Sequence, residues 1–317
     1  MRNRLLNIGK FVVSAGLLAL MLAKVGVRQA MATLAGAHWQ PLLLALILYI
    51  LGIALRALRW QALLRAQKVS VPLGRLVNLY YVGSFFNIML PTGVGGDAVR
   101  AYELTQDSGS AVAAVGTVLT DRAIGLLMLF LMAALVLPFS LNLLEPWVVW
   151  LVLGLTVGSF GGVALFLWSQ PLGRAFRALP APLRRLIDRP ALRKLYFSFS
   201  GYDWPALRVA AGVSVAFNLL LVAVNVLIGL GLGVRVDLGH YLVFTSIISF
   251  LLALPISVSG LGVREWGYMT LFAQVGVASA TALSMSLVLY LITILSGLIG
   301  GVLYAWQGMR GAVKHDA

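Results

Sequence analysis

Long, uninterrupted apolar runs separated by short polar segments dominate the pattern of this chain. A bilayer core of about 30 Å needs about 20 apolar residues per helix. Six runs meet that length: roughly 8–24, 41–60, 112–138, 147–168, 206–232 and 279–307. Membrane β-strands alternate apolar and polar positions, whereas these runs are continuous. The pattern therefore predicts an all-α polytopic membrane protein with six full spans.

Two shorter apolar runs, about 76–90 and 241–256, each end in a Pro and a turn rich in small residues. The first turn reads Leu90-Pro91-Thr-Gly-Val-Gly-Gly-Asp-Ala-Val-Arg100. The second reads Leu254-Pro255-Ile-Ser-Val-Ser-Gly-Leu-Gly-Val-Arg264. Both combine Leu-Pro, a small-residue turn and a final Val-Arg at the same spacing, so the two regions resemble each other.

The composition agrees with a membrane protein. Of the 317 residues, 61% are hydrophobic and only 11% are charged, whereas soluble domains carry about 25% charged residues. The formal charge of +14 would suggest nucleic acid for a soluble protein. Basic cytoplasmic loops explain it better here, so we expect no nucleic-acid partner. Cysteine is absent and the three histidines lie far apart, so we expect no metal and no cofactor.

Lysine and arginine, which concentrate in cytoplasmic loops, orient the chain. They cluster at both ends, in the loop 171–205 and after the second span. The last cluster consists of Arg56, Arg59, Arg65, Lys68 and Arg75. We therefore predict a multi-pass protein of the bacterial cytoplasmic (inner) membrane with both termini in the cytoplasm.

Counting the crossings decides how the two shorter runs enter the membrane. Two full spans separate the basic cluster after the second span from the basic loop 171–205, so residues 76–111 must enter and leave on the cytoplasmic side. By the same count, residues 241–278 enter and leave on the outer side. Each region is a re-entrant hairpin or a pair of short crossings, and the sequence leaves that choice open.

The opposite orientation of these two similar regions predicts an inverted repeat. Residues 1–138 form the first copy and 147–307 the second, which carries the basic loop, within one membrane domain spanning 1–317. Inverted-topology repeats with broken helices near the membrane midplane are typical of secondary transporters.

Charged residues lie in or beside the apolar runs, where each costs about 2.5–3.5 kcal/mol on insertion scales. They are Asp97, Arg100, Asp121, Arg122, Arg264 and Glu265. One interpretation is a set of internal ion pairs, such as Asp97 with Arg122, that only holds helices together. The other is a cavity in which the arginines bind an anionic head group, because a planar guanidinium suits phosphate.

Backbone N–H groups after the two breaks are further candidate anion donors. They belong to Gly93, Gly95 and Gly96 in the first region and to Ser259, Gly260 and Gly262 in the second.

A set of motifs carries a family resemblance. The set consists of Arg56-Ala-Leu-Arg59-Trp60, Tyr81-x-x-x-Phe85-Phe-Asn87-x-x-Leu90-Pro91, Gly95-Gly96-Asp97-x-x-Arg100, Asp121-Arg122 and Pro255-x-Ser-x-x-Gly-Leu-Gly-Val-Arg264-Glu265. Together these motifs resemble the transmembrane, flippase-like domain of lysylphosphatidylglycerol synthases, over almost the whole chain. The chain resembles the stand-alone, YbhN-like members that lack the synthase domain. The resemblance implies translocation of a phospholipid, or of another lipid with a charged head group, between leaflets.

Two functional hypotheses follow, together with a weaker third. The first is a lipid flippase for an anionic or phosphate-bearing head group, of the phospholipid or polyprenyl-phosphate type. The second is a non-transporting membrane scaffold or accessory subunit in envelope lipid or glycolipid assembly, whose mark would be fully paired charges and no head-group-sized cavity. A membrane-embedded enzyme is the third. It lacks a nucleophile or metal set beside its carboxylates, so we expect no enzyme.

The flippase hypothesis makes a defined set of residues the substrate-binding site. They are Asn87, Pro91, Gly95, Gly96, Asp97, Arg100, Asp121, Arg122, Pro255, Ser259, Gly260, Gly262, Arg264 and Glu265. In this set the three carboxylates hold the arginine side chains in position. The lipid, the direction of transport and the energy source stay open. So does a homo-oligomer, because small-residue pairs such as Gly297 and Gly301 pack helices either within or between chains.

Overall fold

The computed structural model describes residues 32–90, 95–139, 141, 145–168, 202–253, 257 and 259–315. The predicted span 8–24 and the basic loop 171–205 up to residue 201 lie outside these ranges. The described part is helical and contains no strand. Its helices are α3 (Trp39–Ala66), α4 (Leu73–Met89), α5 (Gly95–Ser108), α6 (Ala111–Val136), α7 (Pro146–Trp168), α10 (Trp204–Gly231), α11 (Leu238–Ala253), α12 (Val263–Ala273) and α13 (Ser279–His315), with a 3-10 turn η1 (Leu137–Phe139) after α6.

Four of these helices, α3, α6, α10 and α13, are long and apolar enough to cross a membrane. Shorter apolar stretches occupy Pro146–Gly162 in α7 and Leu238–Leu252 in α11. The chain is therefore a multi-pass, all-α membrane protein, as the apolar runs predict. Most predicted bounds agree within a few residues, but α3 continues to Ala66, beyond the run predicted to end at residue 60.

Local sequence explains where the helices begin and end. Ser110 caps α6, because its Oγ accepts a hydrogen bond from the Ala113 backbone N–H at 3.3 Å. Asp203 caps α10 in the same way through Ala206 at 3.1 Å. At the end of α4, Leu90 is extended (φ −95°, ψ 132°), as expected for a residue that precedes a proline.

The connection from α11 to α12 contains two glycines with positive φ. Gly260 and Gly262 have φ of 77° and 81°, a region that residues with a Cβ rarely adopt. Within the region 241–278, the apolar run forms α11, and α12 follows the small-residue turn.

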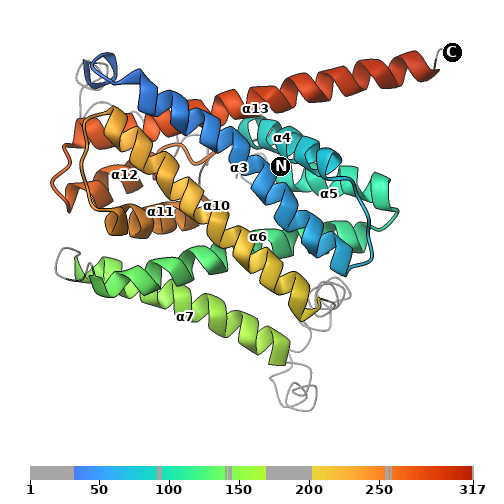
Figure 1. Ribbon diagram of the computed structural model, residues 1–317, viewed down its shortest axis with the longest axis horizontal. Helices are drawn as coiled ribbons and strands as arrows, with labels where there is room; N and C mark the ends of the chain where they lie inside the picture. The colour runs from blue at the N-terminus through green and yellow to red at the C-terminus, as the bar shows by residue number, and fades with distance from the viewer. Residues whose placement is uncertain are drawn as a thin grey trace, which may run out of the picture.

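The two broken pairs, α4 with α5 and α11 with α12, occupy corresponding places in the bundle. The first pair packs on α6 through α5 and on α13 through α4. The second pair packs on α6 through α11 and on α13 through α12. In Figure 1, α3 and α10 lie along each other across the front of the bundle, and α13 extends beyond it at the C-terminal end.

Glycines on α13 allow α4 to approach closely. A Cβ at Gly300 would overlap the backbone of Tyr81, and Cβ atoms at Gly297 and Gly301 would press on Ile88 and Phe85. The predicted Gly297/Gly301 face is thus a packing surface within the chain. The contact matters for function because α4 carries Asn87, one of the predicted site residues.

Overpacking a core typically costs about 1–3 kcal/mol. We expect Gly300→Val to destabilise the folded protein by at least this amount. The added side chain has to displace backbone rather than a flexible side chain. Apparent melting temperature in detergent, followed by monodisperse yield on size exclusion, measures the effect. Gly158→Val is the matched control, since no heavy atom lies within 4 Å of a Cβ there. Equal behaviour of the two variants would contradict the close α4–α13 contact.

Candidate functional site

A cavity of about 370 Å³ with both charged and apolar lining residues lies between the two broken helix pairs. Residues from both pairs line it, together with residues of α3, α6, α10 and α13. Among the predicted site residues, its wall contains Asn87, Asp97, Arg100, Asp121, Arg122, Ser259, Gly260 and Arg264. Gly95, Gly96, Gly262 and Glu265 are buried residues outside this lining. Pro91 and Pro255 lie outside the described residues, as does Gly93.

Asp121 is the centre of the larger charge cluster. Its carboxylate is 1% exposed and accepts hydrogen bonds from Arg59 Nε at 2.6 Å and from Arg100 Nη2 at 3.3 Å. The hydroxyl of Tyr80 also donates to it. One carboxylate on α6 therefore ties together α3, α4 and α5, and its two arginine partners offset the cost of burying it.

Asp97, in the first turn of α5, extends this cluster toward the cavity. It accepts hydrogen bonds from Arg100 Nη1 at 3.1 Å and from Arg122 Nη1 at 2.7 Å. The Asp97–Arg122 pair suggested by the sequence is therefore confirmed. The negative charge of an aspartate in the first turn also interacts favourably with the positive end of the helix dipole.

Arg264 and Glu265 form a second, separate cluster. Glu265 is fully buried and accepts hydrogen bonds from Arg264 Nη2 at 2.6 Å and from Ser286 Oγ at 3.2 Å. The Arg264 guanidinium also lies 4.3 Å from the centre of the Tyr290 ring. This cluster contains one positive and one negative charge, so its net formal charge is zero.

Two of the glycine N–H groups are used inside the chain. The Gly96 N–H donates to Asn87 Oδ1 at 2.8 Å, and the Gly262 N–H donates to Glu265 Oε2 at 2.6 Å. The expectation that these two groups are free to bind an anion is therefore wrong. Gly96 has a packing role instead, because a Cβ there would overlap the carbonyl oxygen of Gly83 on α4.

Ser259 joins the two broken pairs directly. Its Oγ donates to the Asn87 carbonyl oxygen at 3.1 Å, across 172 positions of sequence. The end of α4 and the segment that precedes α12 therefore meet at the cavity.

Arg56 and Arg59 were assigned to a cytoplasmic segment by the sequence, yet both line the cavity. Arg59 is 3% exposed, and besides Asp121 it binds Ser214 Oγ on α10 at 3.1 Å. Arg56 lies over two rings, 4.7 Å from the centre of Tyr80 and 5.5 Å from that of Phe217. The available signal was their spacing, since residues three apart share one face of a helix that continues past them.

The wall of the cavity is rich in positive charge. Within the described residues it contains the five arginines Arg56, Arg59, Arg100, Arg122 and Arg264 against the two aspartates Asp97 and Asp121. Counting Glu265 behind Arg264 still leaves two more positive than negative charges. Such an excess of positive charge favours an anionic ligand over a cationic one.

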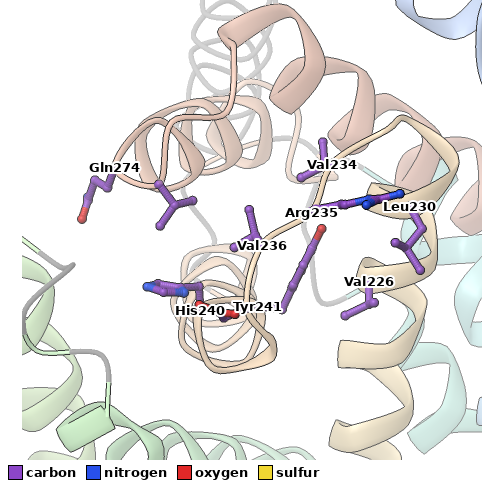
Figure 2. A pocket seen from close by; sticks show the side chains of 10 residues that line it. Val226, Leu230, Val234, Arg235, Val236, His240, Tyr241 and Gln274 are labelled. Atoms are coloured by element: carbon purple, nitrogen blue, oxygen red, sulfur yellow. The ribbon is translucent and has the colours of Figure 1, made fainter.

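A second cavity is larger, about 610 Å³, but has a different character. Figure 2 shows its lining, which comes from the end of α10, the start of α11 and the connection between them, together with the end of α12. Its charged residues, Arg235 and Asp237, balance each other, and it contains none of the predicted site residues. Volume alone would select this cavity, whereas charge and convergence of elements select the smaller one.

A charged cavity lined by long apolar helices and two broken helix pairs defines a polytopic membrane protein with an arginine-rich internal cavity. The chain belongs to the family described as "Lysylphosphatidylglycerol synthase TM region", whose model matches residues 7–301. It is similar to the UPF0104 membrane protein PH1989 of Pyrococcus horikoshii, with 23% identity over 317 residues, covering 92% of this chain and 94% of that protein. The family predicted from the motifs is therefore confirmed.

We expect Asp121→Asn to destabilise the fold by about 3–5 kcal/mol, because it leaves Arg59 and Arg100 buried without their shared carboxylate. Thermal unfolding in detergent, read by tryptophan fluorescence, checks the size of the effect. Asp107→Asn is the control, since Asp107 pairs with Arg75 at 2.8 Å near the surface, where a pair contributes about 0–1 kcal/mol. A loss for Asp121→Asn no larger than that of the control would refute the central role of this carboxylate.

Proposed function

We propose that this protein translocates a lipid with an anionic, phosphate-bearing head group between the leaflets of the cytoplasmic membrane. The observation that carries the proposal is the arginine excess on a cavity formed where the two broken helix pairs meet. Arginine binds phosphate through paired, charge-assisted hydrogen bonds. A cavity of about 370 Å³ also lies within the range of small-molecule sites.

In this proposal the head group enters the cavity while the acyl chains stay in the bilayer. Large apolar side chains on the outer helices, such as Trp150 at 72% and Val302 at 69% exposure, suit contact with lipid chains. Apolar residues also contribute to the cavity wall, among them Leu126, Leu129 and Leu289. Only the charged end of the lipid then needs a polar path, so a small polar lining is sufficient.

The carboxylates act as positioning groups. Asp97 and Asp121 hold Arg100 and Arg122 through the hydrogen bonds described above, so a head group meets guanidinium groups that are already oriented. Orientation before binding lowers the entropy cost of association. This division of roles explains why so many arginines coexist with acids in one cavity.

The proposed architecture has six full spans and two re-entrant hairpins or pairs of short crossings, α4–α5 and α11–α12, arranged as inverted repeats. Packing of both pairs on α6 and α13 supports the repeat. Broken helices that meet at the midplane are where transporters of this build bind their substrates. Both termini would face the cytoplasm.

The scaffold hypothesis has partial support, because four of the five cavity arginines pair with a carboxylate. The scaffold hypothesis also expects no cavity large enough for a head group, whereas the described residues form one of about 370 Å³. Transport is therefore the better-supported function, and a scaffold becomes one outcome of the experiment below.

Proteoliposomes with a fluorescent anionic phospholipid and dithionite quenching of the outer leaflet test transport. We expect rapid loss of the protected fraction in vesicles with wild-type protein and not in empty vesicles. The double variant Arg264→Gln, Glu265→Gln removes a cavity pair without changing net charge, and we expect it to slow transport at least about tenfold, since it removes charge-assisted hydrogen bonds.

The matched control is Arg75→Gln, Glu103→Gln, a pair at 2.9 Å outside the cavity, which should retain wild-type transport. Wild-type rates in both double variants would contradict the site. No transport by the wild-type protein for any lipid in a panel of head groups would favour the scaffold.

A further inference from the structure

The excess charge of the cavity is confined to one side of it. Among the described residues on the side formed by α3, α5 and α6, four arginines (Arg56, Arg59, Arg100 and Arg122) face two carboxylates, Asp97 and Asp121. On the opposite side, Arg264 and Glu265 balance each other. The formal charges of the described residues therefore sum to +2 on this wall and to zero on the opposite side.

Arg56 is the cavity arginine that has no carboxylate partner within the described part of the chain. The other four form the ion pairs given above. Arg56 instead lies against the faces of Tyr80 and Phe217, and its Nε is a buried atom without a hydrogen-bond partner. The two rings orient the guanidinium through cation–π attraction but accept none of its N–H groups. The side chain is thus held in place with its donors unused.

We propose that the head group recognised here is a phosphomonoester, with two negative charges, and that Arg56 distinguishes it from a phosphodiester. A phosphomonoester carries about −1.5 to −2 at pH 7 because its second pKa is about 6, whereas a phosphodiester carries one charge. Two negative charges match the excess of two on the α3, α5 and α6 side, whereas one negative charge leaves an excess of one, and the unused donors of Arg56 are available to the second charge. This inference rests on the proposed function, because it concerns the same site.

The lining argues for a lipid rather than for free phosphate. Beside the arginines, the cavity wall contains apolar side chains that a bare phosphate would leave uncovered, among them Ile88, Leu126, Ile248 and Leu252. A phosphate attached to an apolar chain covers both kinds of surface. A phosphomonoester lipid therefore uses the whole cavity.

Binding of two lipids with identical acyl chains tests the inference. Phosphatidic acid is a phosphomonoester and phosphatidylglycerol a phosphodiester, and native mass spectrometry of the wild-type protein in detergent compares their occupancy. We expect phosphatidic acid to bind about tenfold more tightly at pH 7.5, as charge-assisted hydrogen bonds to a second charge imply. At pH 5 the ratio should fall toward one, because the monoester then loses its second charge.

Arg56→Gln should lower the affinity for phosphatidic acid to about that for phosphatidylglycerol, while phosphatidylglycerol binding shows that the variant is folded. Arg65→Gln is the matched control, since Arg65 is an exposed arginine on the same helix. Its ratio should equal that of the wild type. A ratio unchanged in Arg56→Gln would overturn the role of Arg56.

The remaining outcomes separate this inference from the proposed function. Equal binding of both lipids by the wild type at pH 7.5 would overturn the phosphomonoester preference and leave lipid transport standing. Binding of neither lipid would overturn the site itself. Competition by millimolar inorganic phosphate that matches phosphatidic acid would show that the ligand is a soluble phosphate, which overturns the lipid assignment.

Discussion

The pairing of Asp121 with Arg59 and Arg100 is the interaction on which the rest of this structure depends. A charge left bare in an apolar medium is costly, so the fold has to bring these groups together wherever they lie in the sequence. Asp121 is on α6, and its donors come from α3, α4 and α5. Satisfying one carboxylate therefore fixes the crossing of four helices, and it leaves the arginines as the wall of a cavity.

Close helix packing makes this arrangement possible. Gly300 on α13 lies where a Cβ would overlap the backbone of α4, and Gly96 on α5 lies where one would overlap Gly83. At this separation Asn87 bonds to the Gly96 N–H, and Ser259 bonds to the Asn87 carbonyl. Small residues therefore bring the two broken helix pairs into one site, and polar side chains satisfy the backbone groups that the breaks release.

Paired charges and an excess of positive charge occur in the same cavity, and counting acids against arginines distinguishes its two sides. Within the described residues, Glu265 balances Arg264, whereas the four arginines of the opposite wall outnumber Asp97 and Asp121, which they share, by two. The larger cavity near His240 shows why size is a poor guide, because its charges balance and no predicted site residue reaches it. Membership of the lysylphosphatidylglycerol synthase TM region family agrees with a lipid-related role for the charged cavity.

The sequence by itself determined the membrane class, the approximate helices, the two breaks and the charges that lie among apolar residues. These features are local: a span needs a minimum apolar length, a helix breaks before a proline, and a charge in an apolar run must be satisfied somewhere. Only the tertiary structure decided which groups satisfy one another. Asp121 meets Arg59 from 62 positions away, Arg56 lines the cavity, and the Gly96 and Gly262 N–H groups bond within the chain. The reason is that these contacts depend on how helices cross, and crossing geometry follows from packing between segments distant in the sequence rather than from the pattern within any one of them.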